Sequence, residues 1–311
     1  MLVRGASGLA RSLGVSPLII GLTVVAFGTS APELVVNLLG AIHGETDLAF
    51  GNVVGSNLAN LGLVLGIAAL IAPVGVQGQI VRREIPLLAL ASAMLLVFSS
   101  DALLRGHPST LDRADGLALL LLFLVFFYVT AVDVVRGRGQ DPLLGGIDSV
   151  PRFRRQTLPS RNSLVLAGGL ILLYLGGRFT IDAGTALAAD WGVSPALIGL
   201  VVVAVGTSLP ELVTSVLAAY RREPDLAVGN LVGSNLFNGL FVLPISALIA
   251  DIRIPAGGTA DLLFSLALTA LLVPVALLGR GNISRRWGGG LLALYGAYLG
   301  VRVLTDQGVG A

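Results

Sequence analysis

An internal duplication constrains the fold of this chain more than any other feature. At an offset of 178 positions (193 minus 15), the segment VSPLIIGLTVVAFGTSAPELV at 15–35 aligns with VSPALIGLVVVAVGTSLPELV at 193–213 without a gap. The match continues through GNVVGSNLAN at 51–60 and GNLVGSNLFN at 229–238, and gives roughly 37 identities over 15–72. Two unrelated apolar segments would share leucines and valines, but not two polar motifs in register. The chain is therefore built from two copies of one unit.

The composition places both copies in a lipid bilayer. Hydrophobic residues make up 55% of the 311 residues and charged residues only 12%, and the mean hydropathy is +0.89. Such a chain has too little polar surface to cover a water-soluble globule. Because apolar stretches recur from end to end, we expect an all-α polytopic membrane protein with one membrane domain. The absence of cysteine excludes disulfides and thiolate metal sites.

Apolar segments of membrane-spanning length predict about nine transmembrane helices. We place these spans at 14–40, 47–70, 85–100, 114–134, 162–179, 194–219, 226–250, 259–279 and 287–303.

The arginines predict how these spans are oriented. All 20 basic residues are arginine. When the connections are assigned alternately to the two sides of the membrane, fifteen arginines fall on one side and five on the other. By the positive-inside rule the first side is cytoplasmic, so the N-terminus is inside and the C-terminus outside the cell membrane. The five on the outer side are Arg105, Arg113, Arg178, Arg253 and Arg302.

The order of the spans predicts that the two copies are inverted. The spans at 14–40 and 194–219 are the first and sixth, so an odd number of crossings separates them, and they enter the membrane from opposite sides. We expect a first repeat at 1–134, a short Arg-rich cytoplasmic linker at 135–161 and a second repeat at 162–311.

The first copy lacks one helix that the second copy has. The apolar span at 162–180 precedes the second motif and has no counterpart before the first. We therefore expect about nine helices, which is a ten-helix fold without its first helix, unless the true start of the protein lies further upstream.

The motifs GTSAPE at 28–33 and GTSLPE at 206–211 place one carboxylate in each of two apolar spans. An ionised Glu33 or Glu211 is costly inside a bilayer, so each is expected to face a cavity and to have a partner. Proline lacks an N–H and clashes with the preceding turn, so each helix is expected to kink or break near Pro32 and Pro210. The break would turn backbone carbonyls, including those of Ala26 and Ala204, toward a cation.

The other polar residues of the two motifs are oxygen donors. Hydroxyl groups accompany the glutamates, and Ser56 with Asn60 and Ser234 with Asn238 are spaced four residues apart, on one helical face. The glycine pairs of the second motif are interpreted as helix-packing surfaces. Oxygen donors suit calcium and sodium better than zinc or copper. The candidate ligands are Ala26, Thr29, Ser30, Glu33, Ser56, Asn60, Ala204, Thr207, Ser208, Glu211, Ser234 and Asn238.

Two other interpretations of these residues fit the sequence less well. Small and hydroxyl residues in membrane helices often serve only helix packing. That explanation fails for two glutamates with no arginine or histidine in their spans, which require a mobile cation or protons. An intramembrane enzyme is disfavoured because the motif spans contain no HExxH signature, no histidine base and no cysteine.

At these residues the chain resembles the cation/calcium antiporter superfamily and is closest to prokaryotic sodium/calcium exchangers. The two GTSxPE and GNxVGSNxxN blocks resemble its alpha-1 and alpha-2 repeats. The resemblance implies Glu33 and Glu211 as the main calcium ligands, with the other ten candidates completing the calcium and sodium sites. It implies alternating access, in which the first two helices slide against a rigid core. It implies no cofactor, and as partners Ca²⁺, Na⁺ and membrane lipid, with no nucleic acid and no obligate protein partner.

The sequence departs from the family pattern at the position of Asn238, which is commonly aspartate in close relatives. With asparagine in both copies, two carboxylates remain instead of three. Two carboxylates balance one Ca²⁺, whereas simultaneous binding of several sodium ions is expected to weaken. Proton-coupled or potassium-dependent calcium antiport therefore stays open beside sodium coupling, because desolvated carboxylates can also bind protons.

Overall fold

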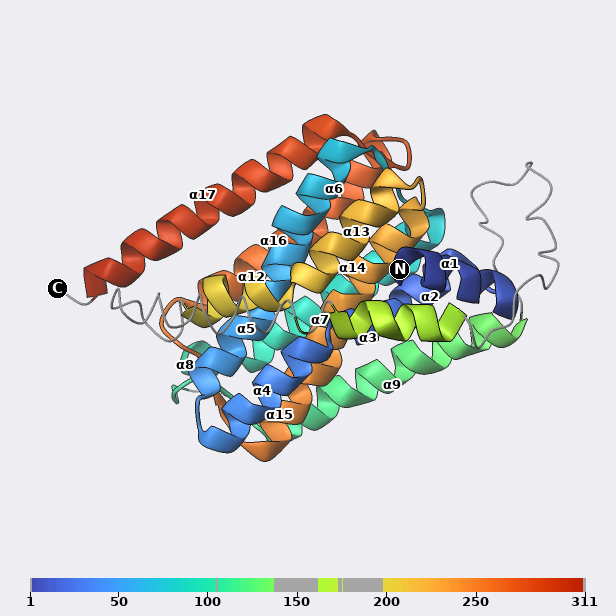
Figure 1. The fold of residues 1–311 in the computed structure, drawn as a ribbon. Helices are drawn as coiled ribbons and strands as arrows, with labels where there is room; N and C mark the ends of the chain where they lie inside the picture. Colours follow the sequence, from blue (N-terminus) through green and yellow to red (C-terminus); the bar gives the residue numbers. More distant parts are fainter. Residues whose placement is uncertain (1, 105, 137–161, 173–174, 176–197, 310–311) are drawn as a thin grey trace.

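The computed structural model describes residues 2–104, 106–136, 162–172, 175 and 198–309, which form a bundle of helices with two short β pairings (Figure 1). The predicted linker at 135–161 lies outside the described residues apart from the last turn of one helix. The elements before it are α1 (Leu2–Leu13), α2 (Pro17–Ile20), η1 (Gly21–Val25), α3 (Ala26–Thr29), α4 (Ala31–His43), α5 (Thr46–Ala59), η2 (Asn60–Val64), α6 (Leu65–Ile71), β1 (Val74–Gly75), η3 (Ile80–Glu84), α7 (Ile85–Phe98), α8 (Asp101–Leu104), β2 (Thr110–Leu111) and α9 (Arg113–Arg136).

The second half repeats much of this order. It opens with a short apolar helix at Asn162–Leu172. The elements that follow are η5 (Ile198–Val203), α12 (Ala204–Thr207), α13 (Leu209–Tyr220), α14 (Pro224–Phe237), η6 (Asn238–Val242), α15 (Leu243–Ile249), β3 (Ile252–Arg253), α16 (Gly258–Leu278), β4 (Asn282–Ile283) and α17 (Arg285–Val309).

Both motif helices are broken where the prolines predict. The pair Pro17–Thr29 and Ala31–His43 is bent by 44°, and the pair Leu200–Thr207 and Leu209–Tyr220 by 51°. Ser30 (φ −84°, ψ 10°) and Ser208 (φ −81°, ψ 3°) occupy the two breaks with nearly the same backbone geometry. Each proline is the second residue of the half-helix that follows, where its missing N–H is tolerated.

The second motif of each copy lies on a long helix that contains a π-helical turn. In the first copy α5, η2 and α6 together run through Thr46–Ile71, and in the second copy α14, η6 and α15 run through Pro224–Ile249. The π-helical turns begin at Asn60 and Asn238, which are equivalent in the duplication. A π-helical turn displaces the side chains around it and often marks a functional position.

The two copies run in opposite directions, as the odd number of crossings predicts. In Figure 1 the helix from α5 to α6 ascends, whereas the helix from α14 to α15 descends. The short strands repeat this relationship, because β1 pairs with β4 and its counterpart β3 pairs with β2. Each pairing therefore ties an end of one half to the other half.

The expected all-α polytopic fold is confirmed, and the number of spans is roughly as expected. Within the described ranges four helices are long and apolar enough to cross a membrane, or six if each bent pair is one span. Three other predicted spans correspond to elements that this criterion omits. One is α7, which has 14 residues after the π-helical turn η3. The others are the short Asn162–Leu172 helix and α17, which carries several glycines and Arg302.

Arg302 lies inside α17 and is neutralised there. Its Nε donates to Asp261 Oδ1 on α16 at 2.8 Å, and its Nη2 donates to Asp261 Oδ2 at 3.2 Å. Tyr298 adds a third donor to the same carboxylate, 2.5 Å from Oδ1. The pair fixes α17 against α16 and needs no ligand.

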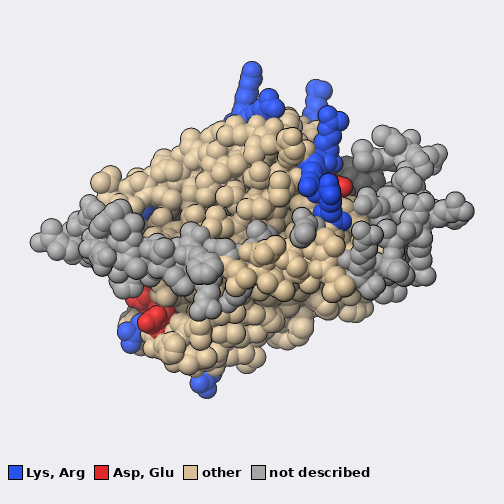
Figure 2. Space-filling model, viewed as in Figure 1, with Lys and Arg blue, Asp and Glu red and all other residues tan. Residues whose placement is uncertain are grey.

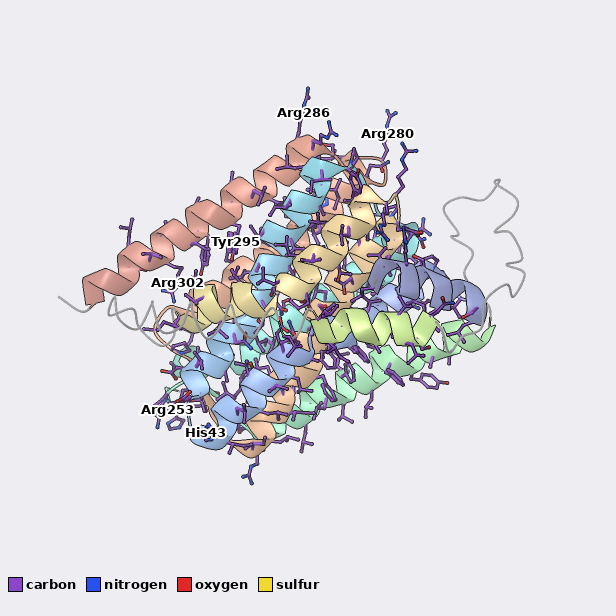
Figure 3. The ribbon with its side chains drawn as sticks, viewed as in Figure 1. His43, Arg253, Arg280, Arg286, Tyr295 and Arg302 are labelled. Carbon is purple, nitrogen blue, oxygen red and sulfur yellow. The ribbon has the colours of Figure 1, made fainter. Side chains whose placement is uncertain are left out.

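The arginines separate along the bundle. On the face shown in Figure 2, basic side chains gather at one end of the molecule, and the largest group of acidic side chains lies at the opposite end. Figure 3 labels Arg280 and Arg286 at the basic end, and Arg253 and His43 at the other. This separation agrees with the side assigned to each of these arginines from the sequence.

Glycines let the two copies cross closely at the centre of the bundle. A Cβ on Gly55 would lie 2.2 Å from the backbone oxygen of Leu200, and one on Gly233 would lie 2.6 Å from that of Leu22. The second motif of each copy therefore packs directly on the first motif of the other. The predicted packing role of these glycines is confirmed at both positions.

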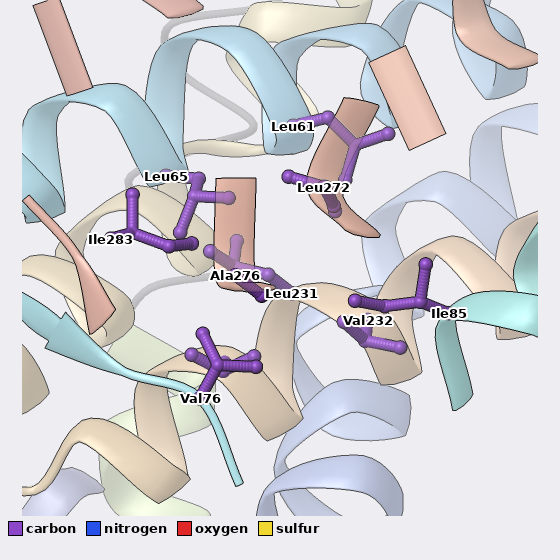
Figure 4. A pocket seen from close by; sticks show the side chains of 10 residues that line it. Leu61, Leu65, Val76, Ile85, Leu231, Val232, Leu272, Ala276 and Ile283 are labelled. Atoms are coloured by element: carbon purple, nitrogen blue, oxygen red, sulfur yellow. The ribbon is translucent and has the colours of Figure 1, made fainter. Parts of the chain in front are cut away.

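One small cavity in this core is purely apolar. Figure 4 shows aliphatic side chains around it, including Leu61, Leu231 and Leu272, and its volume is about 10 Å³. A space of this size without polar partners does not hold water. It is a packing defect and is separate from the polar centre described next.

Candidate cation site

The two glutamates lie at the centre of the bundle, each in the first turn of the half-helix that follows a break. Glu33 on α4 and Glu211 on α13 are both fully buried. A carboxylate in a first helical turn is stabilised by the unpaired N–H groups and the dipole of that helix. The break after the GTS residues thus creates a helix start inside the membrane and positions a negative charge there.

Serines from both copies surround each glutamate. Glu33 Oε1 accepts hydrogen bonds from Ser56 at 3.4 Å and from Ser208 at 3.5 Å. Glu211 Oε1 accepts from Ser234 at 3.1 Å and from Ser30 at 2.8 Å. In each case one serine comes from the same copy and the other from the opposite copy. The duplicated motifs therefore form one shared centre rather than two separate ones.

The carbonyls of Ala26 and Ala204 also face this centre, but the helix breaks do not free them. Ala26 O still accepts the N–H of Ser30 at 2.9 Å, and Ala204 O accepts that of Ser208 at 3.0 Å. The expectation that the break frees these carbonyls is wrong, because proline removes a donor to the residue four positions earlier, which is Gly28 or Gly206. Ala204 O also accepts from Thr207 Oγ1 at 3.1 Å, and Ser56 Oγ lies 3.3 Å from it.

Thr29 and Thr207 meet asparagines of the opposite copy that the sequence analysis missed. Thr207 Oγ1 donates to Asn52 Oδ1 at 3.1 Å, and Thr29 Oγ1 donates to Asn230 Oδ1 at the same distance. The signal was present, since Asn52 precedes Ser56 by four residues and extends the same helical face.

Each of these asparagines is held by a further polar side chain. Asn52 Nδ2 donates to Asn37 Oδ1 at 2.6 Å, and Asn37 Nδ2 donates to the carbonyl of Ala49 at 3.0 Å. In the second copy Asn230 Nδ2 donates to Ser215 Oγ at 3.1 Å. Asn37 and Ser215 are equivalent in the duplication, so both threonines are oriented by matching chains of hydrogen bonds.

Asn60 and Asn238 break this symmetry. Asn60 Nδ2 donates to Asn235 Oδ1 at 2.9 Å, and Asn235 Nδ2 in turn donates to the carbonyl of Asn57 at 3.2 Å. Asn238 is equally buried, yet neither its Oδ1 nor its Nδ2 has a hydrogen-bond partner among the described residues. The two equivalent asparagines therefore differ in how firmly they are held.

Four buried oxygens of the candidate residues have no hydrogen-bond partner within the described part of the chain: Glu33 Oε2, Glu211 Oε2, Asn60 Oδ1 and Asn238 Oδ1. Leaving a buried acceptor unsatisfied costs about 1–3 kcal/mol, and more for a charged group. Neither glutamate forms an ion pair in the described ranges, unlike Glu84 with Arg83 and Asp261 with Arg302. Oxygens without donors around two unpaired carboxylates form an arrangement that a cation satisfies.

Hydrogen bonds and close contacts link ten of the twelve predicted residues around the two glutamates, whereas Asn60 and Asn238 follow Ser56 and Ser234 by one helical turn and make no hydrogen bond with that centre in the described part of the chain. Among the described residues no group of three or more His, Cys, Asp or Glu is placed to hold a metal. A cation held here would therefore be coordinated by two carboxylates together with neutral hydroxyl, amide and carbonyl oxygens. Hard cations such as Ca²⁺ and Na⁺ prefer this donor set.

Comparisons with known proteins agree with this chemistry. A family profile described as "Sodium/calcium exchanger protein" matches residues 1–132 and 162–304. The putative antiporter CaxA of Alkalimonas amylolytica is 37% identical over 97% of this chain and 92% of its own length. A solved structure of the sodium-calcium exchanger NCX_Mj, soaked with 10 mM Na⁺ and zero Ca²⁺, superimposes with a TM-score of 0.75 at 29% identity. The superposition covers 94% of this chain and 90% of the NCX_Mj chain.

A further relative differs in the coupling ion that its name gives. The Ca(2+)/H(+) antiporter ChaA of Bacillus subtilis is 25% identical over 91% of this chain and 83% of its own length.

Proposed function

The chain belongs to the sodium/calcium exchanger protein family, whose matched members are membrane antiporters and not enzymes, and from this premise we propose that it exchanges Ca²⁺ for Na⁺ by alternating access. The four buried oxygens without partners around Glu33 and Glu211 carry the proposal. They supply negative charge and lone pairs where the described part of the chain provides neither a hydrogen-bond donor for these four oxygens nor an ion-pair partner for the glutamates.

The geometry supports binding of one Ca²⁺ between the two half-helix starts. Two carboxylates neutralise its charge, and the free Oε2 atoms bind without breaking a serine contact. Because Ser56 and Ser234 donate their protons to the glutamates, their hydroxyl oxygens and the alanine carbonyls, which lie 3.3 Å and 3.5 Å from them, serve as further ligands. Sodium ions use the same oxygens, so the two ions compete and do not bind together.

Asn238 sets how many sodium ions the site holds. It carries no charge, so Glu33 and Glu211 are the two carboxylates available in this centre. Two sodium ions per calcium would leave the occupied site neutral in both states. More sodium ions would place net positive charge in a desolvated site, which is unfavourable.

We place the two repeats at 1–134 and 162–311, joined by a cytoplasmic linker at 135–161, in the cell membrane. The N-terminus lies in the cytoplasm and the C-terminus outside. The separation of the arginines supports this orientation, since Arg280 and Arg286 lie at the opposite end of the bundle from Arg253 (Figure 3). Ca²⁺, Na⁺ and membrane lipid are its partners, and it needs no cofactor.

Proton-coupled calcium antiport is the second candidate function. It is favoured by the absence of basic partners for Glu33 and Glu211 in the described residues, because such carboxylates can also be neutralised by protons. The relationship to ChaA, which is named as a calcium/proton antiporter, points the same way.

Calcium flux into proteoliposomes distinguishes these functions. The protein is reconstituted, and uptake of radioactive calcium is measured under an outward gradient of sodium, potassium or protons, imposed one at a time. The proposal predicts uptake with the sodium gradient alone and none with the pH gradient alone. Uptake driven only by a pH gradient would reject simple sodium coupling. Sodium-driven uptake that requires added potassium would reject it as well.

A further inference from the structure

A second cavity lies outside the candidate cation site, between α1, the Asn162–Leu172 helix and α13. Its volume is about 200 Å³, and none of the twelve candidate ligands lines it. Most of its wall is aliphatic, from Leu2 and Val3 on α1, Leu172 on the short helix, and Val213 and Leu217 on α13. The cavity is therefore an apolar slot between three helices, two of which precede a motif helix.

The cavity has a basic residue at one end. Arg221 lines it where α13 ends, and its side chain is exposed. Arg222 follows Arg221, and Arg4 follows the lining residue Val3, and both are also exposed. Glu223 follows these two arginines in the sequence, and its single negative charge is outnumbered by the three arginines. This end of the cavity belongs to the arginine-rich side of the protein, where anionic headgroups meet basic residues.

A buried hydroxyl lies deeper in the same wall. Thr214 lines the cavity and is 1% exposed, and its Oγ1 has no hydrogen-bond partner among the described residues. Thr214 and Arg221 are seven residues apart on one face of α13, which corresponds to about 10 Å along a helix. From the membrane surface inward, the cavity thus presents the guanidinium group of Arg221, an aliphatic wall and the hydroxyl of Thr214, which has no hydrogen-bond partner among the described residues.

We propose that this cavity binds one anionic phospholipid, with its phosphate on Arg221 and one acyl chain between α1 and α13. The occupant is a lipid because the slot opens at the basic side of a membrane protein, and basic pockets between membrane helices bind anionic headgroups. Thr214 donates its hydroxyl to an ester carbonyl of the lipid. The assignment uses the proposed orientation of the chain and does not depend on the coupling ion.

The position of the cavity links the lipid to transport. It separates α1 and the Asn162–Leu172 helix from α13, whose first turn carries Glu211. On the same short helix, Leu170 lies against Gly28 of the first motif, where an added Cβ would be 2.5 Å from its Cδ1. A lipid in the cavity therefore touches both the helices that precede the motifs and the helix that holds a cation ligand.

Lipid-dependent thermal stability of the delipidated, full-length protein tests the proposal. Phosphatidylglycerol, phosphatidylcholine and inorganic phosphate are titrated separately into the wild type in detergent, and the Tm is followed. The proposal predicts that phosphatidylglycerol raises the Tm in a saturable way, whereas phosphatidylcholine and phosphate do not. Equal stabilisation by phosphatidylcholine, or stabilisation by phosphate alone, would overturn it.

Three variants test whether phosphatidylglycerol binds in this cavity. Arg221→Gln is expected to weaken phosphatidylglycerol binding about fivefold, the change that one basic residue contributes near an anionic headgroup. Leu217→Trp fills the slot and is expected to abolish saturation. Arg286→Gln, at an exposed arginine on the same side but outside the cavity, serves as the control and should behave as the wild type. Unchanged phosphatidylglycerol binding by both Arg221→Gln and Leu217→Trp would place the lipid elsewhere.

Discussion

Ser30 and Glu211 lie 181 positions apart in the sequence, and Ser30 Oγ donates a hydrogen bond of 2.8 Å to Glu211 Oε1. The mirrored contact joins Ser208 to Glu33 at 3.5 Å. Each copy of the GTSxPE motif thus supplies one glutamate and also a serine that hydrogen-bonds the glutamate of the other copy. Neither copy makes these contacts alone, so the arrangement needs both copies of the motif.

Replacing either glutamate by glutamine is predicted to abolish calcium flux while the fold is retained. Glutamine keeps the volume and an acceptor for the serines, but it removes one of the two charges that balance Ca²⁺. Flux in proteoliposomes and the elution of the purified variants from a sizing column check this. Glu45→Gln and Glu223→Gln, at equivalent positions that precede α5 and α14, are matched controls and should transport normally. Normal flux in Glu33→Gln or Glu211→Gln would reject the site.

Aspartate is predicted to be tolerated at position 238 and not at position 60. Asn238 has no hydrogen-bond partner among the described residues, so Asn238→Asp adds a third carboxylate without breaking a contact. Asn60→Asp would place a carboxylate against Asn235 Oδ1, which now accepts from Asn60 at 2.9 Å. We expect Asn238→Asp to change the sodium dependence of flux, and Asn60→Asp to lower the Tm. An unchanged sodium titration in Asn238→Asp would show that this position has no part in coupling.

The asparagines that accept hydrogen bonds from the two threonines are predicted to increase calcium affinity. Asn52→Ala removes the acceptor of Thr207 Oγ1, and Asn230→Ala removes that of Thr29 Oγ1. Loss of one such hydrogen bond costs about 1 kcal/mol, so the apparent calcium Kd should rise about fivefold in each variant. Calcium titrations of flux measure it, with the exposed Asn282→Ala as the control. Wild-type affinity in both variants would mean that the threonines need no orientation.

The crossing glycines are predicted to be sensitive to a single methyl group. Gly55→Ala and Gly233→Ala would place a Cβ 2.2 Å and 2.6 Å from backbone oxygens of the opposite copy. Forcing these helices apart should cost about 1–3 kcal/mol or more, and a lower Tm reports it. Gly296→Ala on α17 has no atom within 4 Å of the added Cβ, so it should be neutral or slightly stabilising. Equal effects at all three positions would contradict the close crossing.

Much of this architecture could be predicted because it follows from local rules and from the duplication. Proline in an apolar span predicts a break, and Ser30 and Ser208 lie at breaks of nearly equal geometry. An odd number of crossings predicts inversion, which the opposite courses of α5 and α14 confirm (Figure 1). The meeting of the two GTSxPE motifs follows from the same two facts. The role of the twelve polar residues as cation ligands stays a prediction until it is tested.

Other features depend on tertiary packing and left little signal in the sequence. The π-helical turns that begin at Asn60 and Asn238 have no simple sequence signal of their own. The unequal bonding of these two asparagines is invisible in a sequence that gives both the same residue. Asn52 and Asn230 did leave a signal, because each precedes a serine of the second motif by four residues on the same helical face.

Equilibrium calcium binding to the purified protein tests the central claim most directly. We expect one high-affinity Ca²⁺ per chain, displaced competitively by Na⁺ and lost in both Glu33→Gln and Glu211→Gln. Calcium that remains bound at the same stoichiometry in the double variant, with the protein folded, would contradict it.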